Sequence, residues 1–179
     1  MPPHLVWMDM EMTGLDPEVD VILEIATIVT DSELNAIAEG PVLAVSQPES
    51  ALARMNEWNT EHHTASGLID RVRQDGVPLI EAEARTLDFL ERHTTPDTSP
   101  LCGNTIWQDR RFLIKYMPEV AAFLHYRIID VSSIKELAFR WHPELISQRR
   151  KANAHRALED IRESIDELRF YRERFFHTP

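Results

Sequence analysis

Alternating hydrophobic and polar positions at the start of the chain predict a β-strand over residues 4–12 (HLVWMDMEM). Side chains two residues apart share one face of a strand. One face therefore carries an apolar set, namely Val6, Met8, Met10 and Met12. The opposite face carries apolar residues first and then two acids, namely Leu5, Trp7, Asp9 and Glu11.

Two further strands are predicted after a break at residues 13–17 (TGLDP). Residues 21–30 (VILEIATIVT) are rich in β-branched side chains and predict the second strand, and residues 39–45 predict the third. Because turn residues at 31–35 separate them, the three strands are expected to form an antiparallel meander.

Helical patterns dominate the rest of the chain. Helices are predicted at 79–92 and 109–116, and between a cap at Ser132 or Ser133 and residues 142–143. Short strands are predicted at 101–103 and 127–130. A last helix follows from an apolar stripe, namely Ala157, Ile161, Ile165, Leu168, Tyr171 and Phe175. These elements predict one layered α/β or α+β domain over residues 1–179, with helices flanking a mixed sheet.

The composition suits one compact domain, with 179 residues of which 43% are hydrophobic. Apolar runs fall far short of the ~20 residues that cross a bilayer, and the first residues do not resemble a signal peptide. The single cysteine, Cys102, excludes an internal disulfide and a cysteine-built zinc site. We therefore expect a cytoplasmic protein that does not bind membranes.

The formal net charge of −11 argues against a protein that binds long nucleic acid, including long duplexes. Such proteins draw most of their affinity from basic side chains that neutralise many phosphates. An enzyme that gathers carboxylates around cations and handles few phosphates needs no basic surface. The acidity also has a simpler explanation, since it keeps a protein soluble.

Asp9 and Glu11 are the first candidates for chemistry. At positions i and i+2 of a strand their carboxylates stand side by side and repel each other unless a cation, a proton or solvent intervenes. Because Leu5 and Trp7 make the same face apolar, the acids are expected at the end of a buried strand. The alternative is a solvated surface face, and this pair alone does not decide between the two.

Two later segments carry further candidates. Residues 101–109 run from a short strand through Gly103 into a helix, a corner that presents Asp109 at the carboxyl edge of a sheet. His155 and Asp160 would point about 140° apart if both lay in one helix, so they converge better with His155 before the helix start and Asp160 about a turn inside. The alternatives are a helix-start acid for Asp109, a surface histidine, and an aspartate placed by the helix dipole.

Together these residues resemble the DEDD superfamily of 3′–5′ exonucleases, and the histidine marks its DEDDh branch. More narrowly the chain resembles the oligoribonuclease family along almost its whole length, over residues 7–17, 22–29, 55–68, 103–118, 125–137 and 154–165. The resemblance implies an RNase H-like fold and removal of nucleotides from very short single-stranded RNA, down to dinucleotides. It also implies two Mg²⁺ or Mn²⁺ ions held by four carboxylates, with His155 as the general base. The acids carried over are Asp9, Glu11, Asp109 and Asp160.

The same resemblance implies substrate contacts and a homodimer. Leu15 is expected as a wedge against the terminal bases, and Trp58 as a stacking residue; the alternative for both is core packing. Tyr126 is expected to reach across the dimer to the neighbouring site, unless it is only a strand-start aromatic. Contacts with the phosphate or terminal sugar are implied for His63, Thr105 and Gln108.

Two positions depart from the family's usual sequence, and one further acid needs an interpretation. Thr105 stands where the family usually has serine, and Trp107 stands where smaller residues are common. Asp130 is interpreted as structural, fixing the helix that follows it.

Three other readings compete. The nearest is a DEDDh DNA exonuclease or proofreading subunit, with the same metal site and another substrate groove. A nucleotide-binding scaffold that has lost catalysis is disfavoured by the complete set of five catalytic positions. A zinc hydrolase is disfavoured because the chain lacks a closely spaced histidine pair on a helix, and His62 and His63 are the only adjacent histidines.

Overall fold

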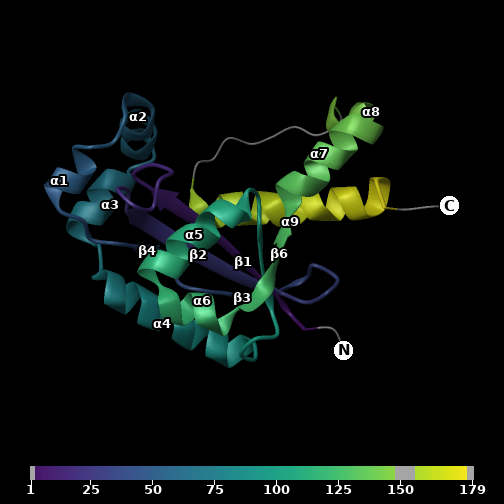
Figure 1. Cartoon of the computed structure of the whole chain (residues 1–179), viewed down its shortest axis with the longest axis horizontal. Helices are drawn as coiled ribbons and strands as arrows, with labels where there is room; N and C mark the ends of the chain where they lie inside the picture. Colours follow the sequence, from purple (N-terminus) through teal and green to yellow (C-terminus); the bar gives the residue numbers. More distant parts are fainter. Residues whose placement is uncertain (1–2, 148–155, 177–179) are drawn as a thin grey trace.

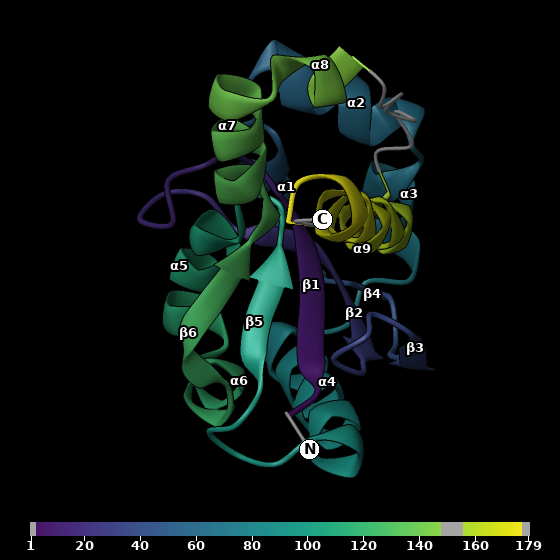
Figure 2. The same cartoon turned by 90° about the vertical axis from the view of Figure 1, so that its right-hand side faces the viewer.

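The computed structural model describes residues 3–147 and 156–176. In this part of the chain six strands form one sheet, in the order β3-β2-β1-β5-β6, with β4 paired to β2. The strands are β1 (Leu5–Met12), β2 (Ile22–Thr30), β3 (Ala36–Glu39), β4 (Leu43–Ala44), β5 (Pro100–Gly103) and β6 (His125–Asp130). β1 runs antiparallel to β2 and parallel to β5, and β5 runs parallel to β6 (Figure 2). The carboxyl ends of β1, β5 and β6 therefore meet at one edge of the sheet.

The first two predicted strands are confirmed, and the third prediction is wrong in its extent. Residues 39–45 are not one strand: β3 ends at Glu39, and β4 begins at Leu43. Gly40 and Pro41 lie between them, and a proline has no N–H to donate to a strand ladder. The antiparallel meander itself is confirmed by the pairing of β2 with β1 and with β3.

Helices cover both faces of the sheet (Figure 1). Apolar residues of α4 (Leu79–His93), α5 (Ile106–Tyr116) and α6 (Pro118–Phe123) pack on the face that carries Val6, Met8 and Met10. Those of α7 (Val131–Trp141) and α9 (Ala157–Arg174) pack on the opposite face, against Trp7. Four further helices complete the described chain, namely α1 (Glu49–Leu52), α2 (Glu57–Ala65), α3 (Leu68–Gln74) and α8 (Pro143–Ser147).

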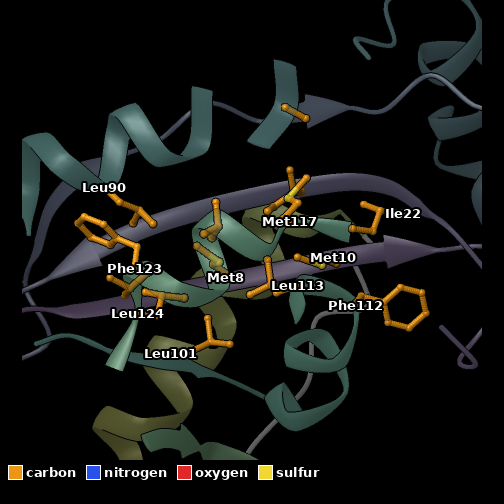
Figure 3. Packing of buried hydrophobic residues seen from close by; sticks show 14 of the residues in the cluster. Met8, Met10, Ile22, Leu90, Leu101, Phe112, Leu113, Met117, Phe123 and Leu124 are labelled. Carbon is orange, nitrogen blue, oxygen red and sulfur yellow. The ribbon is translucent and has the colours of Figure 1, made fainter. Parts of the chain in front are cut away.

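The two cores follow from the alternation in β1. Figure 3 shows Met8 and Met10 directed towards Leu113 and Met117 in the larger core. On the other face Trp7 is fully buried. Its indole N–H donates to the Thr30 hydroxyl at 3.0 Å, so the buried N–H still has a hydrogen-bond partner. Since the α9 face is apolar at Trp7, Asp9 and Glu11 further along the same face enter a largely dehydrated region.

The predicted later helices and strands are confirmed with shifted ends. α5 begins at Ile106, three residues before the predicted start, and α9 begins at Ala157. The predicted serine cap of α7 is wrong, because the Asp130 side chain accepts from the Ser132 N–H at 3.0 Å and caps the helix. Asp130 thus has the structural role inferred for it. Among the described residues, no helix combines the length and apolar character needed to cross a bilayer.

Candidate active site

Three acids meet at the carboxyl end of β1. Asp9 and Glu11 project from β1 towards the face covered by α9, and Asp160 is the fourth residue of that helix. Each contributes a carboxylate oxygen to a group whose members all lie within 4.8 Å of one another. The strand periodicity placed the first two acids together, and the position of Asp160 one turn inside α9 brings the third to them.

Asp109 approaches this group from the helices of the opposite layer. It lies in the first turn of α5, and its side chain is only 7% exposed. Its Oδ1 accepts from the backbone N–H of Met10 at 3.0 Å, so it is tied to β1 between the two strand acids. Gly103 makes this corner possible, since a Cβ there would lie 3.0 Å from the carbonyl oxygen of Met8.

Burial and mutual repulsion make these acids resist ionisation. Loss of solvation, followed by the charges of Asp109 and Glu11, raises the pKa of Asp9 well above its usual value. Burial, followed by the charge of Asp160, raises the pKa of Glu11 to about 8. Burial also raises the pKa of Asp109 to about 7. A cluster of this kind is costly in the absence of a counter-charge.

An ion pair between a buried acid and a partly exposed arginine lies next to Glu11. Glu24 is the cross-strand partner of Glu11 on β2, and its side chain is 1% exposed. The Arg71 guanidinium, from α3, donates to the Glu24 carboxylate. The charge of Glu24 raises the pKa of Glu11 and that of Arg71 lowers it, so the arginine offsets the second buried acid.

His63 contacts the acid cluster from α2. Its Nε2 lies 2.9 Å from the Met12 carbonyl oxygen, and because a carbonyl can only accept, this nitrogen is the donor. Its Nδ1 lies 3.8 Å from Glu11 Oε2. The His63 side chain is 6% exposed and therefore acts as a fixed wall of the site beside Glu11.

The donor set fits divalent cations. Carboxylate oxygens are the ligands that hard cations such as Mg²⁺ prefer, and the group found among the described residues consists of three carboxylates. Repulsion among the acids adds to the effect of burial in raising the pKa values of Asp9 and Glu11. A cation bound here would remove that repulsion, so the site is a metal-binding acidic cluster.

Three of the predicted substrate residues are exposed. Leu15 is 71%, Trp58 58% and Tyr126 67% exposed, which excludes core packing as the explanation for Leu15 and Trp58. The Trp58 ring stacks on that of His62 with 3.8 Å between centroids, so one face of the indole is already occupied.

Thr105 and Gln108 lie on the corner between β5 and α5. The N–H of Thr105 donates to Asp130 Oδ1 at 2.9 Å, and its hydroxyl lies 3.1 Å from that of Ser132, which joins the corner to the cap of α7. Gln108 is 6% exposed, and its amide nitrogen donates to the carbonyl oxygen of Leu15. Gln108 is therefore placed to hold the turn that carries Leu15.

Sequence reasoning missed several residues around the site, and the fifth catalytic prediction stays open. His155 lies outside the described residues. Glu24, Arg71 and Arg111 were not predicted. A buried acid in the otherwise apolar run 22–29 is a signal that could have drawn attention to Glu24.

Comparison with known proteins places the chain in a family. An exonuclease family model matches residues 6–168. The chain is 60% identical over 176 residues to an oligoribonuclease of Dichelobacter nodosus, covering 98% of this chain and 97% of that protein. It is 58% identical over 174 residues to an oligoribonuclease of Pseudomonas aeruginosa, covering 97% of each.

Solved structures agree on the fold. The zinc-bound E. coli exonuclease I–ssDNA complex superposes with a TM-score of 0.74 at 19% identity, covering 97% of this chain. Exonuclease I from Methylocaldum szegediense superposes with a TM-score of 0.70 at 21% identity. The chain spans about two fifths of the length of these exonuclease I chains, 41% in both cases.

The mixed sheet and the flanking helices form an RNase H-like fold, as predicted, and an acidic cluster lies at the carboxyl edge of its sheet. The family match shows that the protein is an exonuclease. Among the exonucleases, the chain belongs to the oligoribonuclease family.

Proposed function

We propose that this protein is a 3′–5′ exoribonuclease that hydrolyses short single-stranded RNA, down to dinucleotides, to mononucleotides. The observation that carries the proposal is the convergence of Asp9, Glu11 and Asp160 within 4.8 Å, in a chain 60% identical to an oligoribonuclease. The proposed cofactors are two Mg²⁺ or Mn²⁺ ions. Four ionised carboxylates against two divalent ions bring the site to local neutrality, which removes the repulsion that raises the pKa values.

The protein's own groups have distinct roles in this proposal. Two bound ions would stabilise the attacking and leaving oxygens of an in-line displacement at phosphorus. Asp9, Glu11, Asp109 and Asp160 would hold them, and the backbone N–H of Met10 keeps the Asp109 carboxylate in place. His155, from the segment before α9, takes the proton of the attacking water as general base.

The proposed substrate contacts surround this centre. Leu15 wedges against the terminal bases, and Trp58 offers its free face for stacking, which is worth ~1–3 kcal/mol per base. His63 and Thr105 border the phosphate and the terminal sugar. Gln108 acts on the substrate through the Leu15 turn, because its amide donates to the Leu15 carbonyl and its side chain is buried.

A homodimer and a cytoplasmic location belong to the same proposal. Tyr126 is 67% exposed at the start of β6, with the Arg127 guanidinium 5.3 Å from its ring centroid. Such an exposed aromatic supports a role at the site of a second copy. The cytoplasm suits a chain whose single cysteine is buried and reduced.

A DNA exonuclease is not favoured as the alternative. The relatives that match this chain at 58–60% identity are oligoribonucleases, whereas exonuclease I matches at 18–21% and supports the fold alone. The net charge of −11 also disfavours a processive enzyme with an extended basic channel.

Metal dependence tests the proposed chemistry. Hydrolysis of a diribonucleotide should require Mg²⁺ or Mn²⁺, stop with a chelator, and fall by at least about a hundredfold in Asp9→Asn and His155→Ala. Exposed Glu91→Gln on α4 is the matched control and should behave as the wild type. Activity that survives the chelator and both substitutions contradicts the two-metal assignment.

A further inference from the structure

The turn that carries Leu15 is attached to α5 along much of its length. The Tyr116 hydroxyl lies 3.0 Å from the Pro17 carbonyl oxygen and 2.6 Å from that of Asp20, so its single hydrogen is shared between them. Lys115 pairs with Glu18 at 3.1 Å. Nearer the site, Gln108 and Arg111 both donate to the carbonyl oxygen of Leu15. The helix that carries Asp109 is therefore also attached to the turn of the exposed Leu15. The position of Leu15 relative to Asp109 is thus fixed through one helix.

Arg111 is the centre of this attachment. Its Nη1 donates to Gln108 Oε1 at 3.0 Å and lies 3.4 Å from the Leu15 carbonyl oxygen. With its oxygen directed to Arg111, the Gln108 amide presents its nitrogen to Leu15. The arginine thus contacts the turn directly and also orients the second donor to it.

Trp107 restrains this arginine. The Arg111 guanidinium carbon lies 5.9 Å from the centroid of the Trp107 ring, one helical turn earlier on α5. Trp107 is 51% exposed, so it is not a core residue whose position packing explains. The large exposed ring instead limits the conformations that Arg111 can adopt.

The turn does not need Arg111 for its own shape. The Thr13 N–H donates to the Val21 carbonyl oxygen at 3.0 Å, and the Thr13 hydroxyl donates to Asp20 Oδ1 at 3.0 Å. Gly14 lets the Asp20 carboxylate close the turn, since a Cβ there would lie 2.4 Å from Asp20 Oδ2. The turn is thus formed by its own contacts, and the contact with Arg111 fixes its position relative to α5.

We propose that Arg111, held over Trp107, is a positioning residue that fixes Leu15 relative to the metal site and so sets the preference for dinucleotides. This inference rests on the proposed function, in which Leu15 wedges against the terminal bases. A substrate with two bases requires Leu15 at a fixed distance from the cleaved phosphate. Hydrolysis of a mononucleotide ester without a second base should not depend on the distance between Leu15 and the cleaved phosphate.

The test compares these two substrates in full-length variants. Arg111→Gln removes the charged donor, Arg111→Lys keeps the charge without the planar fork, and Trp107→Ala removes the ring. Ile114→Ala is the matched control, because it removes a 59%-exposed apolar side chain from the same helix. The substrates are a diribonucleotide and a nucleoside 5′-(p-nitrophenyl phosphate), each with saturating Mg²⁺. Amide hydrogen exchange of residues 13–20 is measured without substrate.

Arg111→Gln should raise the KM for the diribonucleotide at least about fivefold, the effect of one lost hydrogen bond, and speed exchange in residues 13–20. Trp107→Ala should do the same to a smaller extent, and Arg111→Lys should restore part of the loss. The nitrophenyl ester should change by less than about twofold throughout, a selectivity that damage to the fold or to Asp109 would not produce.

Two results overturn the inference: equal losses on both substrates, or a diribonucleotide KM and an exchange rate that do not change. The wild type separates this inference from the proposed function. A wild type that hydrolyses the ester but not the diribonucleotide refutes the proposed function, and the positioning role with it. A wild type active on the diribonucleotide whose variants are unchanged refutes only the role of Arg111.

Discussion

Removing one ionisable group from the acid cluster should stabilise the metal-free protein at pH 7. In Glu11→Gln the side chain keeps its size but can no longer ionise. The wild-type Glu11 carboxyl has its pKa raised to about 8 by burial and by the neighbouring acids. The folded state therefore holds a proton that the unfolded chain, with its pKa near 4.5, would release.

The magnitude follows from the two pKa values. Between 4.5 and pH 7 lie about 2.5 pH units, and at about 1.4 kcal/mol per unit the metal-free fold loses about 3 kcal/mol through Glu11 at pH 7. For a chain of this size 1 kcal/mol shifts the melting temperature by about 2–4 °C. Glu11→Gln should thus melt about 6–12 °C above the wild type at pH 7 without metal.

The sign of the pH dependence is set by the raised pKa. Below pH 4.5 the carboxyl is protonated in both states and costs nothing, and the destabilisation grows as the pH rises towards 8. Wild type and variant should therefore melt together near pH 4.5 and separate progressively up to pH 8. Divalent metal should reverse the trend, because a cation that binds only the folded state stabilises the wild type more than the variant.

Thermal unfolding followed by circular dichroism at several pH values, with chelator or with Mg²⁺, checks this prediction. Glu91→Gln removes an exposed charge from α4 and controls for the change in net charge. A melting-temperature difference between wild type and Glu11→Gln that stays constant from pH 4.5 to 8 would refute the reasoning.

Two further predictions concern the surroundings of the site. Arg71→Met should leave the buried Glu24 carboxylate without its cation and lower the free energy of unfolding at pH 7 by about 3 kcal/mol. Urea unfolding measures this, and the double variant with Glu24→Gln should regain most of the loss; no rescue would count against the pairing. Trp58→Ala should raise the KM for a diribonucleotide roughly 5–150-fold, since stacking is worth ~1–3 kcal/mol, and Trp58→Phe should retain most of the affinity. Steady-state kinetics decide the point, and an unchanged KM in Trp58→Ala would exclude stacking.

Local patterns predicted much of the site. Alternation in β1 placed Asp9 and Glu11 on one face, and the helical stripe beginning at Ala157 placed Asp160 in the first turn of α9. The strand-to-helix corner located Asp109. These features depend on neighbours in sequence, which is why short-range periodicity was sufficient.

Features that depend on distant residues were not predicted. The Glu24–Arg71 pair joins residues 47 positions apart on β2 and α3, and no periodicity encodes that contact. The attachment of Arg111 to the Leu15 turn spans 96 positions. Helix α2 was missed because only His63 of its residues is buried, so it shows no apolar stripe. The cap of α7 was assigned to serine because Asp130 was counted with the preceding strand.

The central claim is that this metal site acts on very short RNA. The most direct test is the length-resolved rate of hydrolysis by the wild type with Mg²⁺ or Mn²⁺. A diribonucleotide, a longer single-stranded RNA and a single-stranded DNA of the same length as the longer RNA would serve as substrates. We expect kcat/KM to be highest for the diribonucleotide and to fall with RNA length, and DNA to be the poorest. Degradation of the long DNA as fast as the diribonucleotide would contradict the account.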